Sequence, residues 1–190
     1  MMVSLAKVKA VQQSAELLVS LETLYAGFDR MAQAMHEELA DQDPLFLCVM
    51  NGGLLATAEL LKRVHFPLQC DYIHATRYRG KTSGSASLHW KHFPATDVKN
   101  RVVVIVDDIL DGGVTLAAIV DYCEAKKAKK VYTAVMLDKP AGRTKNGLQK
   151  ANFVGVEIPD RFVFGFGLDY YDYLRNVPGI YAVADEHLKN

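Results

Sequence analysis

The residues best suited to chemistry concentrate in one short stretch, 107–115, which reads DDILDGGVT. Two adjacent carboxylates, Asp107 and Asp108, open the stretch and can bind a cation or the hydroxyl groups of a sugar. A third carboxylate, two glycines and a hydroxyl follow at Asp111, Gly112, Gly113 and Thr115. Glycine-rich backbone N–H groups at a helix start bind phosphate dianions. A ligand with both a phosphate and a diol, such as a phosphorylated ribose, would satisfy both sets of groups.

The flanking residues predict the elements that hold this stretch in place. Residues 102–106 are uninterrupted Val and Ile, which is typical of a strand buried on both faces in a parallel sheet. We expect that strand to end at Asp107, where ligands of open α/β sheets bind. Apolar residues at helical spacing from Leu116 predict a helix just beyond the glycines. Paired acids also occur in phosphoacceptor domains and nucleotide hydrolases, and Asp before Gly-Gly can merely shape a turn.

A similar pattern occurs earlier in the chain. Residues 20–39 place apolar side chains on one helical face, and Asp43-Pro44 ends that helix. The apolar run 45–50 then meets Asn51-Gly52-Gly53 before helical spacing resumes. A structural turn explains Gly-Gly equally well. Its place at the end of another predicted strand favours a functional loop.

The middle of the chain is less informative. Residues 68–75 predict a strand, and 77–87 are rich in Gly, Ser and cations, as in a disordered loop or a lid over a site. His89 and His92 have metal-like spacing, but the sequence offers no third ligand. We interpret both as loop histidines.

Two further strands are predicted at 131–137 and 153–158. Asp138-Lys139-Pro140 follows the first of these strands, and a lysine in such a place is usually only solvated. Gly142 and Gly147 have the separation of a P-loop, but Leu148 and Gln149 stand where that motif needs Lys and Ser or Thr. The segment 165–167, Gly-Phe-Gly, lacks the third glycine and the placement of a dinucleotide-binding motif. Both nucleotide-binding motifs are therefore excluded.

The whole chain, 1–190, is expected to form a single domain, because 190 residues, half of them hydrophobic, suit one domain with a sizeable core. Its 22 basic and 22 acidic residues cancel, so we expect no nucleic-acid partner and only a local anion site. We also expect no membrane partner and no signal peptide. The three isolated cysteines indicate a reducing compartment, and we expect a cytoplasmic protein.

Two motifs resemble known families. The stretch VVVIVDDILDGGVTL resembles the phosphoribosyl-pyrophosphate signature of the type I phosphoribosyltransferases, and 158–175, IPDRFVFGFGLDYYDYLR, resembles the carboxyl-terminal motif of the hypoxanthine-guanine phosphoribosyltransferases. The resemblance implies an α/β fold with a central, mostly parallel sheet flanked by helices and a small hood from the terminal segments. It also implies Mg²⁺ and a homodimer or homotetramer. The implied reaction joins a 6-oxopurine base to phosphoribosyl pyrophosphate, giving a nucleoside monophosphate and pyrophosphate.

The resemblance also implies roles on the sugar-phosphate side. Asp107 and Asp108 would hold the ribose hydroxyls and the metal-bearing substrate, although the family commonly has Glu at the first position. The phosphate cradle would comprise Gly112, Gly113, Val114 and Thr115, of which Gly112 and Val114 replace a common hydroxyl and a common lysine. Asn51 and Gly52 would lie in a loop with a non-proline cis peptide that touches pyrophosphate, which Arg175 would also contact. Asp169 would hold a second metal ion.

On the base side, the resemblance makes Asp111 the general base near the purine N7. Lys139 would contact the exocyclic oxygen, Phe162 would stack on the ring and the Val163 main chain would meet the Watson-Crick edge. The segment 77–87 would be a lid, although it has Arg77-Tyr78 where the family usually has Ser-Tyr. A non-catalytic regulator on the same fold is the alternative, but it would need a DNA-binding module or a basic face.

Overall fold

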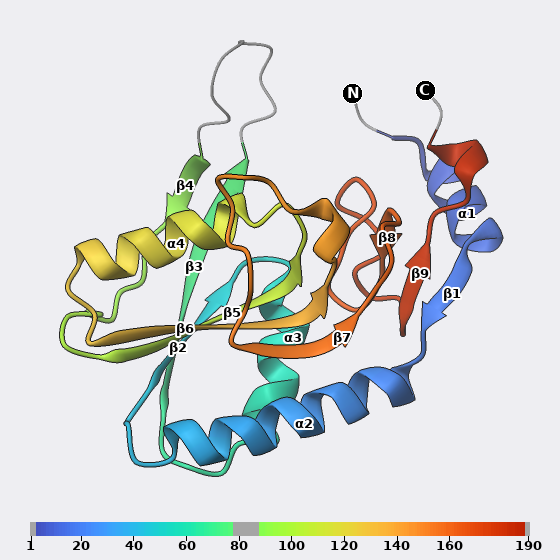
Figure 1. Ribbon diagram of the computed structural model, residues 1–190. Coiled ribbons are helices and arrows are strands. Elements are labelled where there is room, and N and C mark those ends of the chain that lie inside the picture. Colours follow the sequence, from blue (N-terminus) through green and yellow to red (C-terminus); the bar gives the residue numbers. More distant parts are fainter. Residues whose placement is uncertain (1–2, 78–87, 189–190) are drawn as a thin grey trace.

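The computed structural model describes residues 3–77 and 88–188 and is built on a six-stranded sheet (Figure 1). The strands in spatial order are β4 (Leu88–His92), β3 (Gln69–Arg77), β2 (Leu45–Val49), β5 (Val102–Leu110), β6 (Lys130–Asp138) and β7 (Phe153–Glu157). All neighbours are parallel except β4, which runs antiparallel to β3. No helix in these described ranges is long and apolar enough to cross a membrane.

Helices cover both faces of the sheet (Figure 1). On one face lie α2 (Leu21–Leu39) and α3 (Gly53–Leu61), and α4 (Val114–Ala125) lies on the other. Alternate side chains of β5 pack toward each layer: Val102, Val104 and Val106 join the α2 and α3 cluster, while Val103 and Ile105 join the α4 cluster. The predicted strand with two buried faces is confirmed.

The long helix α2 follows its predicted pattern. Ser20 caps it by accepting a hydrogen bond from the Thr23 N–H at 3.2 Å. Its buried side chains recur every three or four residues and include Leu24, Phe28, Met31, Met35 and Leu39. This apolar face packs on the sheet, as the sequence predicted.

The two ends of the chain together form the hood that the resemblance implied. It comprises α1 (Leu5–Ser14) and a small antiparallel sheet of β1 (Glu16–Val19), β9 (Ile180–Ala182) and β8 (Val163–Phe164). A separate apolar cluster that includes Val11, Phe164 and Val183 holds α1 to the carboxyl-terminal segment. Two short 3-10 helices, Pro140–Gly142 and Asp185–His187, complete the elements of the described chain.

Two predictions about these elements were wrong. The strand β5 does not end at Asp107 but continues to Leu110, because β6 stays paired with it as far as Leu110 and Asp138. His89 and His92 do not lie in a loop but on β4, an edge strand whose residues alternate between exposed and half-buried. The predicted lid falls mainly on residues 78–87, which lie outside the described residues; Arg77 is the last residue of β3.

Candidate functional site

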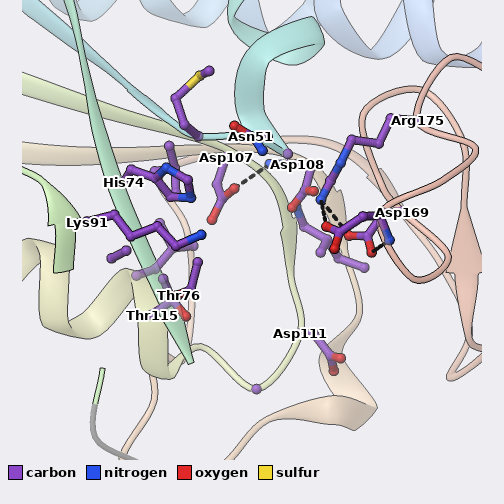
Figure 2. Close-up of a pocket in the computed structure, with 18 of the residues that line it drawn as sticks. Asn51, His74, Thr76, Lys91, Asp107, Asp108, Asp111, Thr115, Asp169 and Arg175 are labelled. Atoms are coloured by element: carbon purple, nitrogen blue, oxygen red, sulfur yellow. Dashed lines mark hydrogen bonds and ion pairs between the residues drawn. The ribbon is translucent and has the colours of Figure 1, made fainter. Parts of the chain in front are cut away.

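The candidate site is a cavity of about 1070 Å³ at the carboxyl ends of β2 and β5 (Figure 2). These strands are neighbours, yet α3 leaves β2 toward one face of the sheet and α4 leaves β5 toward the other. Ligands of α/β sheets bind at such switch points. The structure brings these predicted residues to the cavity: Asn51, Gly52, Asp107, Asp108, Asp111, Gly112, Gly113, Thr115, Asp169 and Arg175.

The acid pair lies at the floor of this cavity. The Asp107 side chain is buried and accepts a hydrogen bond from the Asp108 N–H at 2.9 Å. The Asp108 carboxylate accepts one from the Ile109 N–H at 2.6 Å. Burial and the neighbouring Asp108 charge raise the pKa of Asp107 well above its ordinary value, and burial also raises the pKa of Asp108. Such a pair favours a cation or hydroxyl donors in the cavity.

The loop after β2 lies directly against this pair. A Cβ atom on Gly52 would overlap the Asp108 carboxylate, so only glycine fits there without a shift. The Met50–Asn51 peptide bond is cis, in agreement with what the resemblance implied. Asn51 and Gly52 therefore form one wall of the site, next to Asp108.

The phosphate loop, defined as residues 111–115, begins α4. Gly113 is the residue before the helix and has φ of +76°, which glycine adopts without strain. The Gly112 carbonyl accepts a hydrogen bond from the Thr144 hydroxyl at 2.8 Å, and the Gly113 carbonyl accepts one from the Leu148 N–H at 3.0 Å. The first N–H groups of α4 have no partner within the helix and can bind an anion. Val114, by contrast, does not line the cavity.

The base side of the site lies next to the cavity and shares Asp111 with it. The Lys139 ammonium lies 3.1 Å from the Asp111 carboxylate and 3.2 Å from that of Asp160, and its side chain is 11% exposed. It also lies 3.5 Å from the Arg161 carbonyl. The predicted lysine is therefore an ion-paired, buried group rather than a solvated one.

Phe162 and Val163 continue this base side without lining the cavity itself. The Phe162 ring is 47% exposed and meets Tyr170 edge to face, with ring centroids 6.3 Å apart. The Val183 N–H donates to the Phe162 carbonyl at 2.8 Å. In an antiparallel pair, hydrogen-bonded and non-bonded positions alternate, so the Val163 N–H and C=O point away from β9. The Val163 N–H and C=O are thus free of β9 and available to the hydrogen-bonding edge of a ligand.

Asp169 and Arg175 belong to the carboxyl-terminal motif and line the cavity from the side opposite His74 and Lys91 (Figure 2). The Arg175 guanidinium lies 2.8 Å from Asp169 and donates to the Gly167 carbonyl at 2.7 Å. Asp169 also accepts a hydrogen bond from the Asp172 N–H at 2.8 Å. The predicted second metal ligand and the predicted pyrophosphate contact are therefore paired with each other in this structure.

Sequence reasoning missed Arg143, which ties the two sides together. Its guanidinium donates to the carbonyls of Asp111 at 2.7 Å and Lys139 at 3.1 Å, and also to that of Leu110. It also pairs with Asp138, and its side chain is only 11% exposed. These bonds fix the ends of β5 and β6 relative to each other. An arginine four residues after a strand-end lysine was the only local signal.

Sequence reasoning also missed three polar residues on β3 and β4 that line the cavity: His74, Thr76 and Lys91 (Figure 2). Burial lowers the pKa of His74, and the charges of Lys91 and Arg175 lower it further. His74 is therefore largely neutral near pH 7. No periodic pattern in the sequence indicates this wall, because the wall depends on how β4 pairs with β3.

The number and the chemistry of the cavity's carboxylates indicate whether they could hold a metal ion. Among the residues that the structure describes, no group of three or more His, Cys, Asp or Glu side chains is arranged to hold a metal ion. Mg²⁺ is commonly held by one or two carboxylates together with substrate phosphates and water. Asp107 and Asp108 fit that arrangement because they are oxygen donors on the floor of the cavity.

Known proteins resemble this chain in sequence and in fold. Residues 15–171 match the family described as phosphoribosyl transferase domain. The hypoxanthine-guanine phosphoribosyltransferase of Bacillus subtilis is 34% identical over 165 residues, which cover 87% of this chain and 91% of the relative. That of Streptococcus thermophilus is 30% identical over 171 residues, with 90% and 94% covered. A solved hypoxanthine phosphoribosyltransferase from Staphylococcus aureus superposes with a TM-score of 0.87 at 26% identity, covering 95% of this chain and 98% of the other.

Proposed function

The chain belongs to the phosphoribosyl transferase family, and we propose that its cavity carries out the reaction of a hypoxanthine-guanine phosphoribosyltransferase. It is a transferase of purine salvage. It moves the 5-phosphoribosyl group of phosphoribosyl pyrophosphate to hypoxanthine or guanine, which gives IMP or GMP and pyrophosphate. One observation carries this proposal: the acid pair and the phosphate loop share a cavity, and Asp111 joins that cavity to the buried Lys139.

The sugar phosphate would occupy the main cavity. The N-terminal N–H groups of α4 and the Thr115 hydroxyl would bind the 5′-phosphate. Asp107 and Asp108 would accept hydrogen bonds from the ribose hydroxyls, which suits buried carboxylates. Asn51, Gly52 and Arg175 would surround the pyrophosphate, and the guanidinium would then exchange part of its bond with Asp169 for the ligand.

The proton transfer is assigned to Asp111. Its carboxylate lies at the border between the cavity and the base side, where the purine N7 would meet it. The carboxylate accepts the proton that N7 loses as the new glycosidic bond forms. Lys139, 3.1 Å away, stabilises the negative charge and orients the group.

Selection of the base would come from Lys139, Phe162 and Val163. The ammonium donates to the exocyclic oxygen, the Val163 carbonyl accepts from N1–H, and the exposed Phe162 ring stacks on the purine. Adenine reverses the donor and the acceptor at these positions. The pocket therefore favours 6-oxopurines over 6-aminopurines.

The family acts on a substrate that carries a divalent cation, and we propose Mg²⁺ here. Asp107 and Asp108, and Asp169 at a second position, would hold it together with the substrate oxygens. When bound, the ion neutralises charge on the departing pyrophosphate. Asp107 is one methylene shorter than the Glu common in the family, so its carboxylate reaches less far into the cavity.

The regulator alternative is not favoured. The chain has balanced charge, and its residues match catalytic relatives over most of its length. We further propose one phosphoribosyltransferase domain over 1–190, a cytoplasmic location and a homodimer or homotetramer. These three proposals rest on composition and on the resemblance, and light scattering of the purified protein tests the last.

The direct test is to incubate the purified protein with phosphoribosyl pyrophosphate, Mg²⁺ and each purine base, and to measure pyrophosphate release together with the nucleotide formed. Equimolar pyrophosphate and IMP or GMP are expected. Binding of phosphoribosyl pyrophosphate without any turnover would instead identify a regulator.

A further inference from the structure

The strand β4 contains a β-bulge at Lys91. Along the pair of β3 with β4, His74 lies opposite His92, but the next residue, Ala75, lies opposite Trp90. Lys91 is therefore an extra residue without a partner on β3. Bulges bend a strand and redirect a side chain, and they are common beside active sites.

The bulge places the neighbours of Lys91 on different surfaces. The Trp90 ring packs near Tyr122 of α4, with centroids 5.6 Å apart, whereas the His92 ring stacks on Tyr72 at 4.3 Å. In a regular strand, residues 90 and 92 would share one face. These aromatic contacts anchor both sides of the bulge, and Lys91 between them lines the cavity together with Thr76 and Thr115 (Figure 2).

Charges in the cavity are unbalanced. In the described part of its lining the carboxylates are Asp107, Asp108, Asp111, Asp169 and Asp172, and the cations are Lys91 and Arg175. Arg175 is paired with Asp169 and Asp172. Lys91 forms no ion pair with a carboxylate of the described residues. It is thus the cation of this lining that is free to bind an anion.

The phosphate loop has no cation of its own. Residues 111–115 read Asp-Gly-Gly-Val-Thr, and the Val114 side chain does not line the cavity. Backbone N–H groups and Thr115 can orient a phosphate, but they leave a dianion close to Asp111 and the acid pair. An additional positive charge from another wall would offset that repulsion.

We propose that Lys91 binds the 5′-phosphate of the substrate and supplies the positive charge that the phosphate loop lacks. This inference rests on the proposed function. A lysine suits the position, since a flexible stem carries a compact charge with three donors to a phosphate that the loop already orients. The cation of the phosphate site would thus lie on the bulged strand β4 and not in the loop.

The test compares wild type with Lys91→Met, Lys91→Arg and the control Lys99→Met, which alters an exposed lysine beyond β4. Calorimetry measures the affinity for GMP, whose phosphate is the 5′-phosphate, and for pyrophosphate with Mg²⁺. Lys91→Met is expected to weaken GMP binding about tenfold, as for loss of a charge-assisted hydrogen bond. Pyrophosphate affinity and the thermal midpoint should stay unchanged. Lys91→Arg should lose less, and Lys99→Met nothing.

The outcomes for GMP and for pyrophosphate distinguish the 5′-phosphate site from the pyrophosphate site. Unchanged GMP affinity in Lys91→Met, or a loss confined to pyrophosphate, overturns the inference while leaving the proposed function in place. Failure of wild type to bind GMP at all overturns the proposed function itself.

Discussion

Most of the residues on the phosphate side of the site lie in one continuous segment, 107–115, whereas the base side brings together Lys139 from one segment and Asp160 and Phe162 from another. On the phosphate side, short hydrogen bonds to backbone N–H groups hold the carboxylates. On the base side, ion pairs of about 3.1 and 3.2 Å hold the key lysine. A local motif can thus encode the first side, but only tertiary packing can assemble the second.

Asp111 belongs to both sides. It is part of the phosphate loop, yet its carboxylate contacts Lys139, and a Cβ atom on Gly142 would overlap it. Arg143 then bonds the backbone carbonyls of both Asp111 and Lys139. Amino-acid substitutions on the two sides should therefore have separable effects on sugar-phosphate binding, on proton transfer and on the choice of base.

The largest effect is expected from metal removal, which acts on the phosphate side. Carboxylates outnumber cations in the described cavity lining, so pyrophosphate departure needs added positive charge. Exhaustive chelation should lower the rate by at least about 10³-fold, since a catalytic ion contributes several kcal/mol. Pyrophosphate release before and after chelation measures this, and added Mg²⁺ or Mn²⁺ should restore it. Full rate in the chelated enzyme would contradict the metal assignment.

Asp111→Asn should have the next largest effect. The amide keeps the shape but cannot accept a proton, so kcat should fall by about 10²-fold or more. The affinity for phosphoribosyl pyrophosphate should stay nearly constant. Steady-state kinetics measure both quantities, with Asp121→Asn on the exposed side of α4 as the matched control. Near-normal turnover would remove Asp111 from the role of base.

Lys139→Met should alter the base side selectively. The ratio of kcat/KM for hypoxanthine to that for adenine should fall by about tenfold, because a charged hydrogen bond to the exocyclic oxygen is lost. Affinity for pyrophosphate should not change. The exposed Lys145→Met in the following loop is the control. An unchanged ratio would show that the lysine plays no part in base choice.

Arg143→Lys should have the smallest effect of the four. Lysine keeps the charge but cannot span the carbonyls of Asp111 and Lys139, so kcat should fall by about tenfold or less through misplacement of the base. Guanidinium ion at millimolar concentration should partly restore the rate of Arg143→Ala. Arg101→Lys, which alters bonds at the other end of the sheet, is the control. Absence of rescue would argue for a general loss of stability.

The sequence predicted much of the fold and of the phosphate side because their signals are local. The run 102–106, the acids and the glycines adjoin one another, and the structure brings all but Val114 of the predicted loop to the cavity. The predicted end of β5 was wrong because its pairing with β6 extends the strand, and a strand partner cannot be read from one segment.

The parts that sequence missed depend on contacts between distant segments. His74 and Lys91 line the cavity through the bulged pairing of β3 with β4. Arg143 donates hydrogen bonds to backbone carbonyls, which every residue type has. Neither arrangement produces a periodic or compositional pattern. Lys139, Phe162 and Val163 were assigned by resemblance, and their roles remain predictions that the variants above test.

The central claim is that Asp111 joins a phosphoribosyl site to a pocket for 6-oxopurines. The most direct measurement is kcat/KM of the wild-type enzyme for hypoxanthine, guanine and adenine at saturating phosphoribosyl pyrophosphate. Mispaired buried groups cost roughly 1 to 3 kcal/mol each, so at least one 6-oxopurine should be preferred over adenine by about 10²-fold or more. Comparable use of adenine would contradict the pocket built from Lys139, Phe162 and Val163.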